Sequence, residues 1–169
     1  DVYKRQLEVD IVLRTEVKPE TIDALKPDVV ILATGSKPYV PPIPGVDSKH
    51  VSTALEILEK GINRLNGKEN IIIAGGGMVG CETAEFISDE SKGREKITIV
   101  EMLEEVASDA DPTEREFLLQ RLKDKGIQIQ LNRKVDEIRP DGLIAIDKGR
   151  KRHHIKGDFL ILAMGMEPD

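Results

Sequence analysis

The stretch from Asn70 to Phe86, NIIIAGGGMVGCETAEF, constrains the fold of this 169-residue chain more than any other part of the sequence. A continuous apolar run, typical of a buried strand, enters three glycines, and the residues that follow have helical character. Gly75, Gly77 and Gly80 form the pattern G-x-G-x-x-G at this junction. A strand that leads through such a turn directly into a helix is typical of a parallel sheet covered by helices. We therefore expect an α/β fold of the Rossmann-like, three-layer type.

The elements expected after residue 50 alternate between helix and strand. Strands are expected at 71–74, 96–101 and 127–131, and helices at 52–60 (with Ser52 or Thr53 at its start), 78–88 and 111–126. The last helix has Asp111 as its capping residue, Pro112 at its first position, Glu114 in the capping-box position and Gly126 beyond its end. Residues 134–165 add short β-runs separated by PDG and KG turns. We expect these runs to form a small β-meander beside the parallel sheet.

The first 45 residues follow a different pattern. Strands are expected at 7–13 and at 29–35, and a short helical or turn segment is expected at 19–28. The second strand is a continuous apolar run, which predicts burial on both faces. Residues 36–45 carry four prolines, so they form neither a central strand nor a helix. We interpret them as an extended connector that crosses between two domains.

The three glycines of the pattern have separate roles if the loop binds a dinucleotide. Gly75 permits a tight turn, and Gly77 lets the backbone approach a pyrophosphate that a Cβ atom would block. Gly80 allows the helix to pack closely on the strand. The pyrophosphate then lies at the free N–H groups and positive dipole end of the helix. The loop residues between the glycines complete the predicted site: Gly76, Met78 and Val79.

Glu101 ends the next strand, 21 positions after Gly80. A carboxylate at this place accepts hydrogen bonds from both hydroxyls of the adenosine ribose and repels a 2′-phosphate. Glu104 and Glu105 follow, with no Arg or Lys beside them, so we expect NADH to be preferred over NADPH. The motif alone leaves FAD as an alternative ligand. It also leaves a ligand-free glycine joint with a solvated glutamate.

Two residues of the following helix have open roles. Cys81 is either a reactive thiol at a helix N-terminus or, as we favour, a small packed residue. Glu82 either complements the helix dipole or faces the nicotinamide end of the cofactor. Because Cys81 is the single cysteine, the chain has no internal disulfide, redox pair or iron–sulfur ligand set. The three histidines lack ligand-like spacing, so we expect no metal site.

The charge balance also excludes several function classes. The net charge of −6 argues against a nucleic-acid or anionic-membrane surface. The basic cluster KGRKRHH, residues 148–154, either grips a phosphate or, as we favour, is a solvated hairpin turn. No apolar run approaches the length of a membrane span, and no secretory signal opens the sequence. We expect a cytoplasmic protein whose partners are small nucleotide cofactors.

The order of motifs along the chain resembles one family. The matching segments are DVVILATGSKPYVPPIPG, IIIAGGGMVGCETAEF, ITIVEMLEEVASD and FLILAMGMEPD. They look like the C-terminal flavoprotein half of the NADH:flavin oxidoreductases, which include 2,4-dienoyl-CoA reductase, enoate reductase and bile-acid enoate reductases. That half is similar to flavoproteins of the pyridine nucleotide–disulfide reductase type. The resemblance covers nearly the whole chain from Leu7 onward.

The resemblance implies two nucleotide sites. Ala33, Thr34 and Gly35 would close a strand of an FAD domain, while Gly75 to Gly80 and Glu101 would form the NAD(H) site of an inserted domain. Ala163 to Gly165 would match the return crossing. In the family, electrons pass from NADH to FAD and through a 4Fe–4S cluster to FMN in an N-terminal barrel, where an activated C=C bond is reduced. The barrel and the cluster cysteines are absent from this sequence, so we expect the isolated chain to be inactive and assign it no catalytic residue.

The same resemblance predicts the domain limits. Residues 7–45 would be a partial FAD-binding domain with its crossover, 46–157 the NAD(H)-binding domain, and 158–169 a strand that returns toward the FAD domain. Residues 1–6, DVYKRQ, are what the codons GAT-GTG-TAT-AAG-AGA-CAG encode, the end of a transposon-based sequencing adaptor. We therefore expect these six residues to be an adaptor-derived artefact, and the partner of the chain to be the remainder of its parent protein.

The sequence thus predicts the NADH-binding part of a flavin-dependent oxidoreductase. Hydride would pass from NADH to FAD, for reduction of an α,β-unsaturated carbonyl compound elsewhere in the parent protein. One alternative is another flavoprotein on the same scaffold, such as an NADH oxidase or a ferredoxin-type or disulfide reductase. A second alternative is a nucleotide-binding module without redox turnover.

Overall fold

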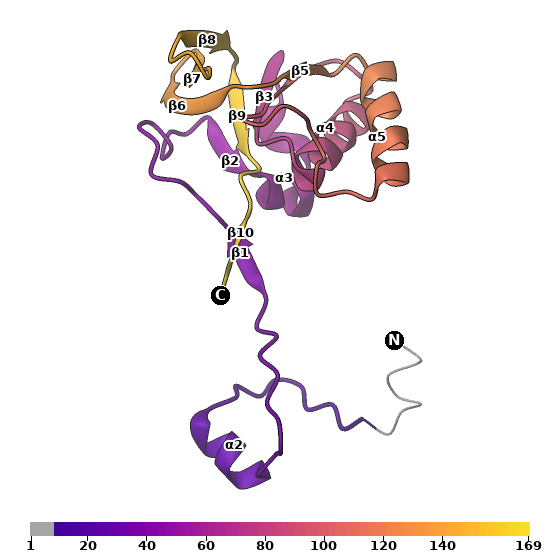
Figure 1. Ribbon diagram of the computed structural model, residues 1–169, viewed down its shortest axis with the longest axis vertical. Helices are drawn as coiled ribbons and strands as arrows, with labels where there is room; N and C mark the ends of the chain where they lie inside the picture. The colour runs from indigo at the N-terminus through magenta and orange to yellow at the C-terminus, as the bar shows by residue number, and fades with distance from the viewer. Residues whose placement is uncertain (1–8) are drawn as a thin grey trace. The chain divides into compact units, whose positions relative to one another are not determined.

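The computed structural model describes residues 9–169, which divide into two units at Thr34 and Gly35 (Figure 1). The prediction of an adaptor-derived segment at residues 1–6 lies outside the described residues. No helix in the described part of the chain has the length and apolar character needed to cross a membrane.

The first unit contains one regular element within residues 9–34, the helix α2 (Pro19–Leu25), as expected for this segment. The strands predicted at 7–13 and 29–35 are wrong for the residues described, because neither 9–13 nor 29–35 has strand structure. A strand buried on both faces needs hydrogen-bonded neighbours, and residues 9–34 supply none. The apolar side chains of this run are consequently exposed, with 85% of Ile31 and 82% of Leu32 accessible.

The second unit is built on a five-stranded parallel sheet in the order β2-β9-β3-β4-β5. The strands are β2 (Val51–Thr53), β3 (Asn70–Ala74), β4 (Lys96–Val100), β5 (Gln128–Gln130) and β9 (Phe159–Leu162). Each neighbouring pair is parallel, so the carboxyl ends of all five strands lie along one edge. The α/β class with a parallel sheet is confirmed.

Three helices and one short 3-10 helix connect these strands. They are α3 (Ala54–Lys60), the 3-10 helix η1 (Ile62–Leu65), α4 (Met78–Glu90) and α5 (Pro112–Asp124). Thr53, not Ser52, caps α3 by accepting a hydrogen bond from the Glu56 N–H at 3.2 Å. Asp111 caps α5 as expected, because its carboxylate accepts from the Thr113 N–H at 2.9 Å. The capping residues therefore set both helix starts.

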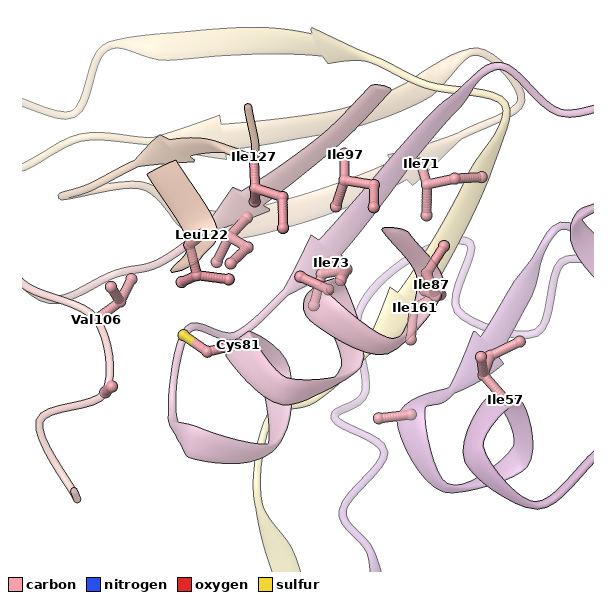
Figure 2. Packing of buried hydrophobic residues seen from close by; sticks show 14 of the residues in the cluster. Ile57, Ile71, Ile73, Cys81, Ile87, Ile97, Val106, Leu122, Ile127 and Ile161 are labelled. Carbon is pink, nitrogen blue, oxygen red and sulfur yellow. The ribbon is translucent and has the colours of Figure 1, made fainter. Parts of the chain in front are cut away.

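The alternation of side chains along the strands produces two cores. On one face, Ile71 and Ile73 of β3 pack with residues of α3, α4 and α5. Figure 2 shows Ile71 beside Ile97 of the neighbouring strand, with Ile87 of α4 close to them. On the other face, Ile72 and its neighbours pack against a second layer of strands.

That second layer is an antiparallel meander of β6 (Lys134–Arg139), β7 (Gly142–Ile146) and β8 (Arg152–Lys156). Its apolar residues, such as Leu143 and Ile155, share the core of Ile72. Helices, parallel sheet and meander thus form three layers, and Figure 1 shows the helices and the meander on opposite sides of the sheet.

Residues 158–169 have a composite structure. Phe159–Leu162 forms β9, which lies between β2 and β3 inside the five-stranded sheet. After it, β10 (Met166–Pro168) pairs in antiparallel fashion with β1 (Ser36–Pro38), the start of the proline-rich connector. The two crossing segments of the second unit therefore run side by side. The predicted domain limits at residues 45 and 157 stay predictions.

Candidate functional site

A cavity of about 700 Å³ lies at the carboxyl edge of the parallel sheet. This is the edge at which ligands bind in open α/β folds. Its lining residues all belong to the second unit: Tyr39, Pro41, Pro42, Ile43, Gly75, Gly76, Gly77, Val100, Glu101, Met102, Leu103, Glu105, Ser108, Asp109, Arg133, Lys134, Val135, Ala163, Met164 and Gly165. The glycine loop after β3, the ends of β4 and β9, and the connector therefore share one cavity.

The glycine loop is closely packed at its two outer glycines. Gly75 has a φ of +107°, and a Cβ atom on it would lie 2.2 Å from the carbonyl oxygen of Ala163. A Cβ atom on Gly80 would lie 2.1 Å from the carbonyl oxygen of Gly75. Both clashes are with backbone, so neither position accepts a side chain. These glycines perform the turn and packing roles expected of them.

Gly77 differs from the other glycines of the motif. The three atoms nearest to a Cβ atom on Gly77 would all belong to the carboxylate of Asp109, with the nearest oxygen at 3.3 Å. A side-chain tip can rotate away, whereas backbone cannot. The surface of Gly77 therefore faces the cavity, as the close approach of a ligand requires.

Glu101 is 8% exposed and fastens the glycine loop. Its Oε2 accepts a hydrogen bond from the Gly76 N–H at 2.6 Å, and its Oε1 accepts from the Leu103 N–H at 2.8 Å. The carboxylate thus satisfies two backbone donors at the bottom of the cavity. An ionised carboxylate has about four acceptor sites, so these two bonds leave capacity on both oxygens.

Asp109 is a second carboxylate at the loop, which sequence reasoning missed. Its Oδ1 lies 2.9 Å and its Oδ2 3.3 Å from the backbone nitrogen of Met78, the first residue of α4. It therefore caps α4 from a loop 31 residues further along the chain. No motif relates the two positions, because the contact depends on how the loop after β4 folds back.

That loop is anchored just before Asp109. The Ala107 N–H donates to the Gly76 carbonyl at 2.7 Å, and Val106 and Ala107 are buried. Arg115 of α5 donates from Nε to the Val106 carbonyl at 2.9 Å and forms an ion pair with Glu105. The loop is consequently held against both the glycine turn and α5.

Cys81 is fully buried beneath this loop, which confirms its expected role as a packed residue. Its thiol lies 3.5 Å from the Gly76 carbonyl oxygen. Burial, together with the nearby carboxylates of Asp109 and Glu101, raises the pKa of Cys81 to about 12. The thiol is therefore protonated and chemically inert at neutral pH.

The structure brings together part of the predicted site. Gly75, Gly76, Gly77, Glu101 and Gly165 line the cavity. The remaining predicted residues of α4 lie in its first two turns outside the lining: Met78, Val79, Gly80 and Glu82. Ala33 and Thr34 belong to the first unit, and Gly35 opens the second.

Three further groups in the lining were missed by sequence reasoning. Arg133 and Lys134 follow β5, and the rule that ligands bind at carboxyl ends of parallel strands could have indicated them. The connector residues Tyr39 to Ile43 form another wall, where the Tyr39 N–H donates to the Gly165 carbonyl at 3.0 Å. Asp109, described above, is the third.

Residues 148–151 of the basic cluster lie in the turn between β7 and β8, as favoured from the sequence, while residues 152–154 begin β8. Asp147 accepts hydrogen bonds from the Gly149 and Lys151 N–H groups, both at 2.9 Å. Lys148 forms an ion pair with Glu104, and Arg152 pairs with Asp136 at 3.1 Å. These cations therefore already have carboxylate partners.

Comparison with known proteins identifies the family of this chain. Residues 3–169 match the model of the pyridine nucleotide-disulphide oxidoreductase family, and the chain belongs to that family. An NADH oxidase of Thermoanaerobacter brockii is 38% identical over 151 residues, which span 88% of this chain and 23% of the relative. A cinnamate reductase of Clostridium sporogenes is 30% identical over 164 residues, 95% of this chain and 23% of the relative.

Solved structures agree with this assignment. A 2-naphthoyl-CoA reductase in complex with 2-naphthoyl-CoA is similar with a TM-score of 0.78 at 26% identity, over 99% of this chain and 24% of that one. The water-forming NADH oxidase of Lactobacillus brevis bound to NADH has a TM-score of 0.59 at 26% identity, over 80% of this chain and 30% of that one. The chain thus spans less than half of the length of the curated relatives it matches, from 20% to 41% of each.

Proposed function

We propose that the cavity at the glycine loop binds NADH for a flavin-dependent oxidoreductase. The observation that carries this proposal is the environment of Gly77, which lines a cavity of about 700 Å³ and whose Cβ position has a movable side-chain carboxylate, that of Asp109, as its nearest neighbour. Gly75 and Gly80, by contrast, are closed by backbone. Backbone therefore closes the loop at the two glycines that shape the turn, whereas at Gly77, where a pyrophosphate would approach, the neighbour is a side chain that can move.

The residues that would hold the dinucleotide follow from the positions of donors and acceptors. The backbone N–H groups of Gly77, Met78 and Val79 begin α4, where N–H groups lack intrahelical partners, and they would bind the pyrophosphate. Glu101 would accept the ribose hydroxyls with the acceptor capacity that its two backbone hydrogen bonds leave. When bound, NADH supplies a hydride for the flavin.

The negative charge at the cavity supports a preference for NADH over NADPH, whereas the positive charges in the same lining reduce that preference. The buried carboxylate of Glu101 would repel a 2′-phosphate. Arg133 and Lys134 line the same cavity and would attract one. We therefore expect NADH to bind more tightly than NADPH, with a moderate ratio of affinities.

For the parent protein, we propose reduction of an activated C=C bond, with FAD bound partly by residues 7–45 and with FMN and a 4Fe–4S cluster elsewhere. Support comes from the similarity to a cinnamate reductase, since cinnamate is an α,β-unsaturated acid, and to a 2-naphthoyl-CoA reductase. The apolar run at residues 29–32, which is exposed here, is also consistent with a strand completed by other parts of an FAD domain.

The second candidate is an NADH oxidase, favoured by the 38% identity to the Thermoanaerobacter brockii enzyme. Anaerobic assay of the parent protein with NADH and a cinnamate-type acceptor separates the two. Acceptor reduction without oxygen supports the first candidate, whereas NADH consumption that requires oxygen supports the second. NADH binding without either reaction would identify a nucleotide-binding module.

Calorimetric titration of the full 169-residue chain with NADH and with NADPH tests the site itself. We expect tighter binding of NADH, and we expect Glu101→Gln to reduce the preference because it removes the charge that repels the 2′-phosphate. Equal affinities in the wild-type chain would contradict the role of Glu101. Circular dichroism of the variant is the control, since Gln can satisfy only one of the two backbone donors.

A further inference from the structure

The carboxylate of Asp109 occupies the place where the proposed ligand would carry its negative charge. Its two oxygens lie 2.9 and 3.3 Å from the Met78 nitrogen. Its Oδ2 lies 3.3 Å and its Oδ1 3.6 Å from the position that a Cβ atom on Gly77 would take. Asp109 therefore covers both features that a pyrophosphate would use, the first free N–H of α4 and the open face of Gly77.

A carboxylate and a pyrophosphate cannot share this place. Both are anions, both seek the positive end of α4, and the donor at Met78 is already used by Asp109. Glu101 and Glu105 also line the cavity, and Arg115 is paired with Glu105, so these groups do not compensate the added charge. The cations Arg133 and Lys134 follow β5, on another segment of the lining.

Asp109 lies on a short exposed segment between two fixed residues, so its side chain can move away from α4 without displacing them. Ala107 on one side is buried and bonded to the Gly76 carbonyl. Asp111 on the other side is fixed as the cap of α5. Ser108 and Asp109, between these anchors, are exposed. Rotation of the exposed Asp109 side chain would free the start of α4 while the anchors stay in place.

We propose that Asp109 is a built-in competitor of the dinucleotide at the glycine loop. Its carboxylate caps α4 when the site is empty, and binding of the pyrophosphate displaces it. The proposal rests on the proposed NADH site and adds a control of affinity to it. NADH binding must break the existing cap, and release of NADH restores it.

Two substitutions separate the cap from the charge. Asp109→Ala removes both, so NADH should bind about fivefold more tightly if the displaced cap is worth a typical amount. Asp109→Asn keeps a neutral capping oxygen, so we expect a smaller increase in affinity. If Asp109→Ala proves poorly folded, the NADH affinity of Asp109→Asn can still be compared with that of wild type, because asparagine is an equally good capping residue and should preserve the fold.

Asp111→Ala is the matched control. Asp111 makes the same kind of contact two residues away, with the Thr113 N–H at 2.9 Å, but it caps α5 and does not line the cavity. Its loss should lower the melting temperature and leave NADH affinity unchanged. Both measurements use the full 169-residue chain, with NADH as the titrant.

The outcomes distinguish this proposal from the proposed function. Tighter binding by Asp109→Ala than by wild type, with Asp109→Asn between them, supports the competitor. Weaker or equal binding by both variants, in a wild-type chain that binds NADH, overturns the competitor and leaves the NADH site standing. Absence of NADH binding in the wild type and in all variants overturns both.

Discussion

At the scale of single residues, the two carboxylates of the glycine loop have different relations to the sequence. Glu101 could be predicted because the dinucleotide motif includes an acidic residue at the end of the second strand. Its bonds to the Gly76 and Leu103 amides could not be predicted, because they depend on the path of the loop. Asp109 carries no sequence signal, since its contact with α4 is set entirely by tertiary folding.

Cys81 provides a residue-scale prediction. Because the thiol is fully buried with a pKa raised to about 12, it should resist a disulfide-exchange reagent in the native chain at about pH 8. The same reagent should label Cys81 rapidly in urea. Absorbance of the released thiolate measures both rates. Rapid stoichiometric labelling of the native chain would show that the thiol is accessible and would contradict the packed position.

At the scale of elements, the sequence predicted those helices and strands that are specified by residues adjacent in the chain. The helix that begins after Asp111 and the strand before Gly75 were predicted correctly, because capping chemistry and an apolar run specify them. The short strand β2 was missed, since it has three residues and the last of them, Thr53, is also the cap of α3. The strand predicted at 29–35 was wrong because a buried strand depends on neighbours that residues 9–34 do not supply.

Asp158 connects two strands at the amino edge of the parallel sheet, opposite the edge where the cavity lies. Its Oδ2 accepts from the Asn70 N–H at 2.8 Å and from the Glu69 N–H at 3.1 Å, which fastens the start of β9 to the start of β3. Hydrogen bonds from the Asn70 backbone are the main reason that the pKa of Asp158 lies below its ordinary value of 3.8. The contribution of this carboxylate to stability is therefore present above that value and is lost as pH falls through the folded-state pKa.

We expect Asp158→Ala to lower the free energy of unfolding by about 2 kcal/mol near neutral pH, because two backbone donors lose a charged acceptor. The difference from wild type should shrink at about pH 3, because this pH lies below the ordinary pKa and the carboxylate is then mostly protonated in the unfolded chain. Urea unfolding of the wild type and the variant at both pH values measures this difference in the free energy of unfolding. An equal difference at the two pH values would mean that the charge of Asp158 does not contribute. NADH affinity should be unchanged, since Asp158 does not line the cavity.

At the scale of the whole molecule, the candidate site is contained in one unit of the chain. Its lining residues all lie within Gly35–Asp169, although this chain spans only 23% of the Thermoanaerobacter brockii NADH oxidase. The order of motifs predicted a flavoprotein of the pyridine nucleotide–disulfide reductase type, and the family match over residues 3–169 confirms that assignment, whereas the ene-reductase subfamily stays a proposal. The acceptor that the flavin reduces stays a proposal. Nucleotide binding, in contrast, can be tested on the chain itself.

The most direct test of the central claim is calorimetric titration of NADH into the wild-type chain and into Gly77→Ala. A Cβ atom at Gly77 would have the movable carboxylate of Asp109 as its nearest neighbour, so the variant should fold with nearly wild-type stability. Gly80→Ala, in contrast, should be strongly destabilised, because its Cβ atom would lie 2.1 Å from backbone. We predict that the wild-type chain binds NADH and that folded Gly77→Ala loses at least about tenfold in affinity, because the methyl group blocks the pyrophosphate. Equal affinity of the two folded proteins for NADH, or no binding by the wild-type chain, would contradict the account.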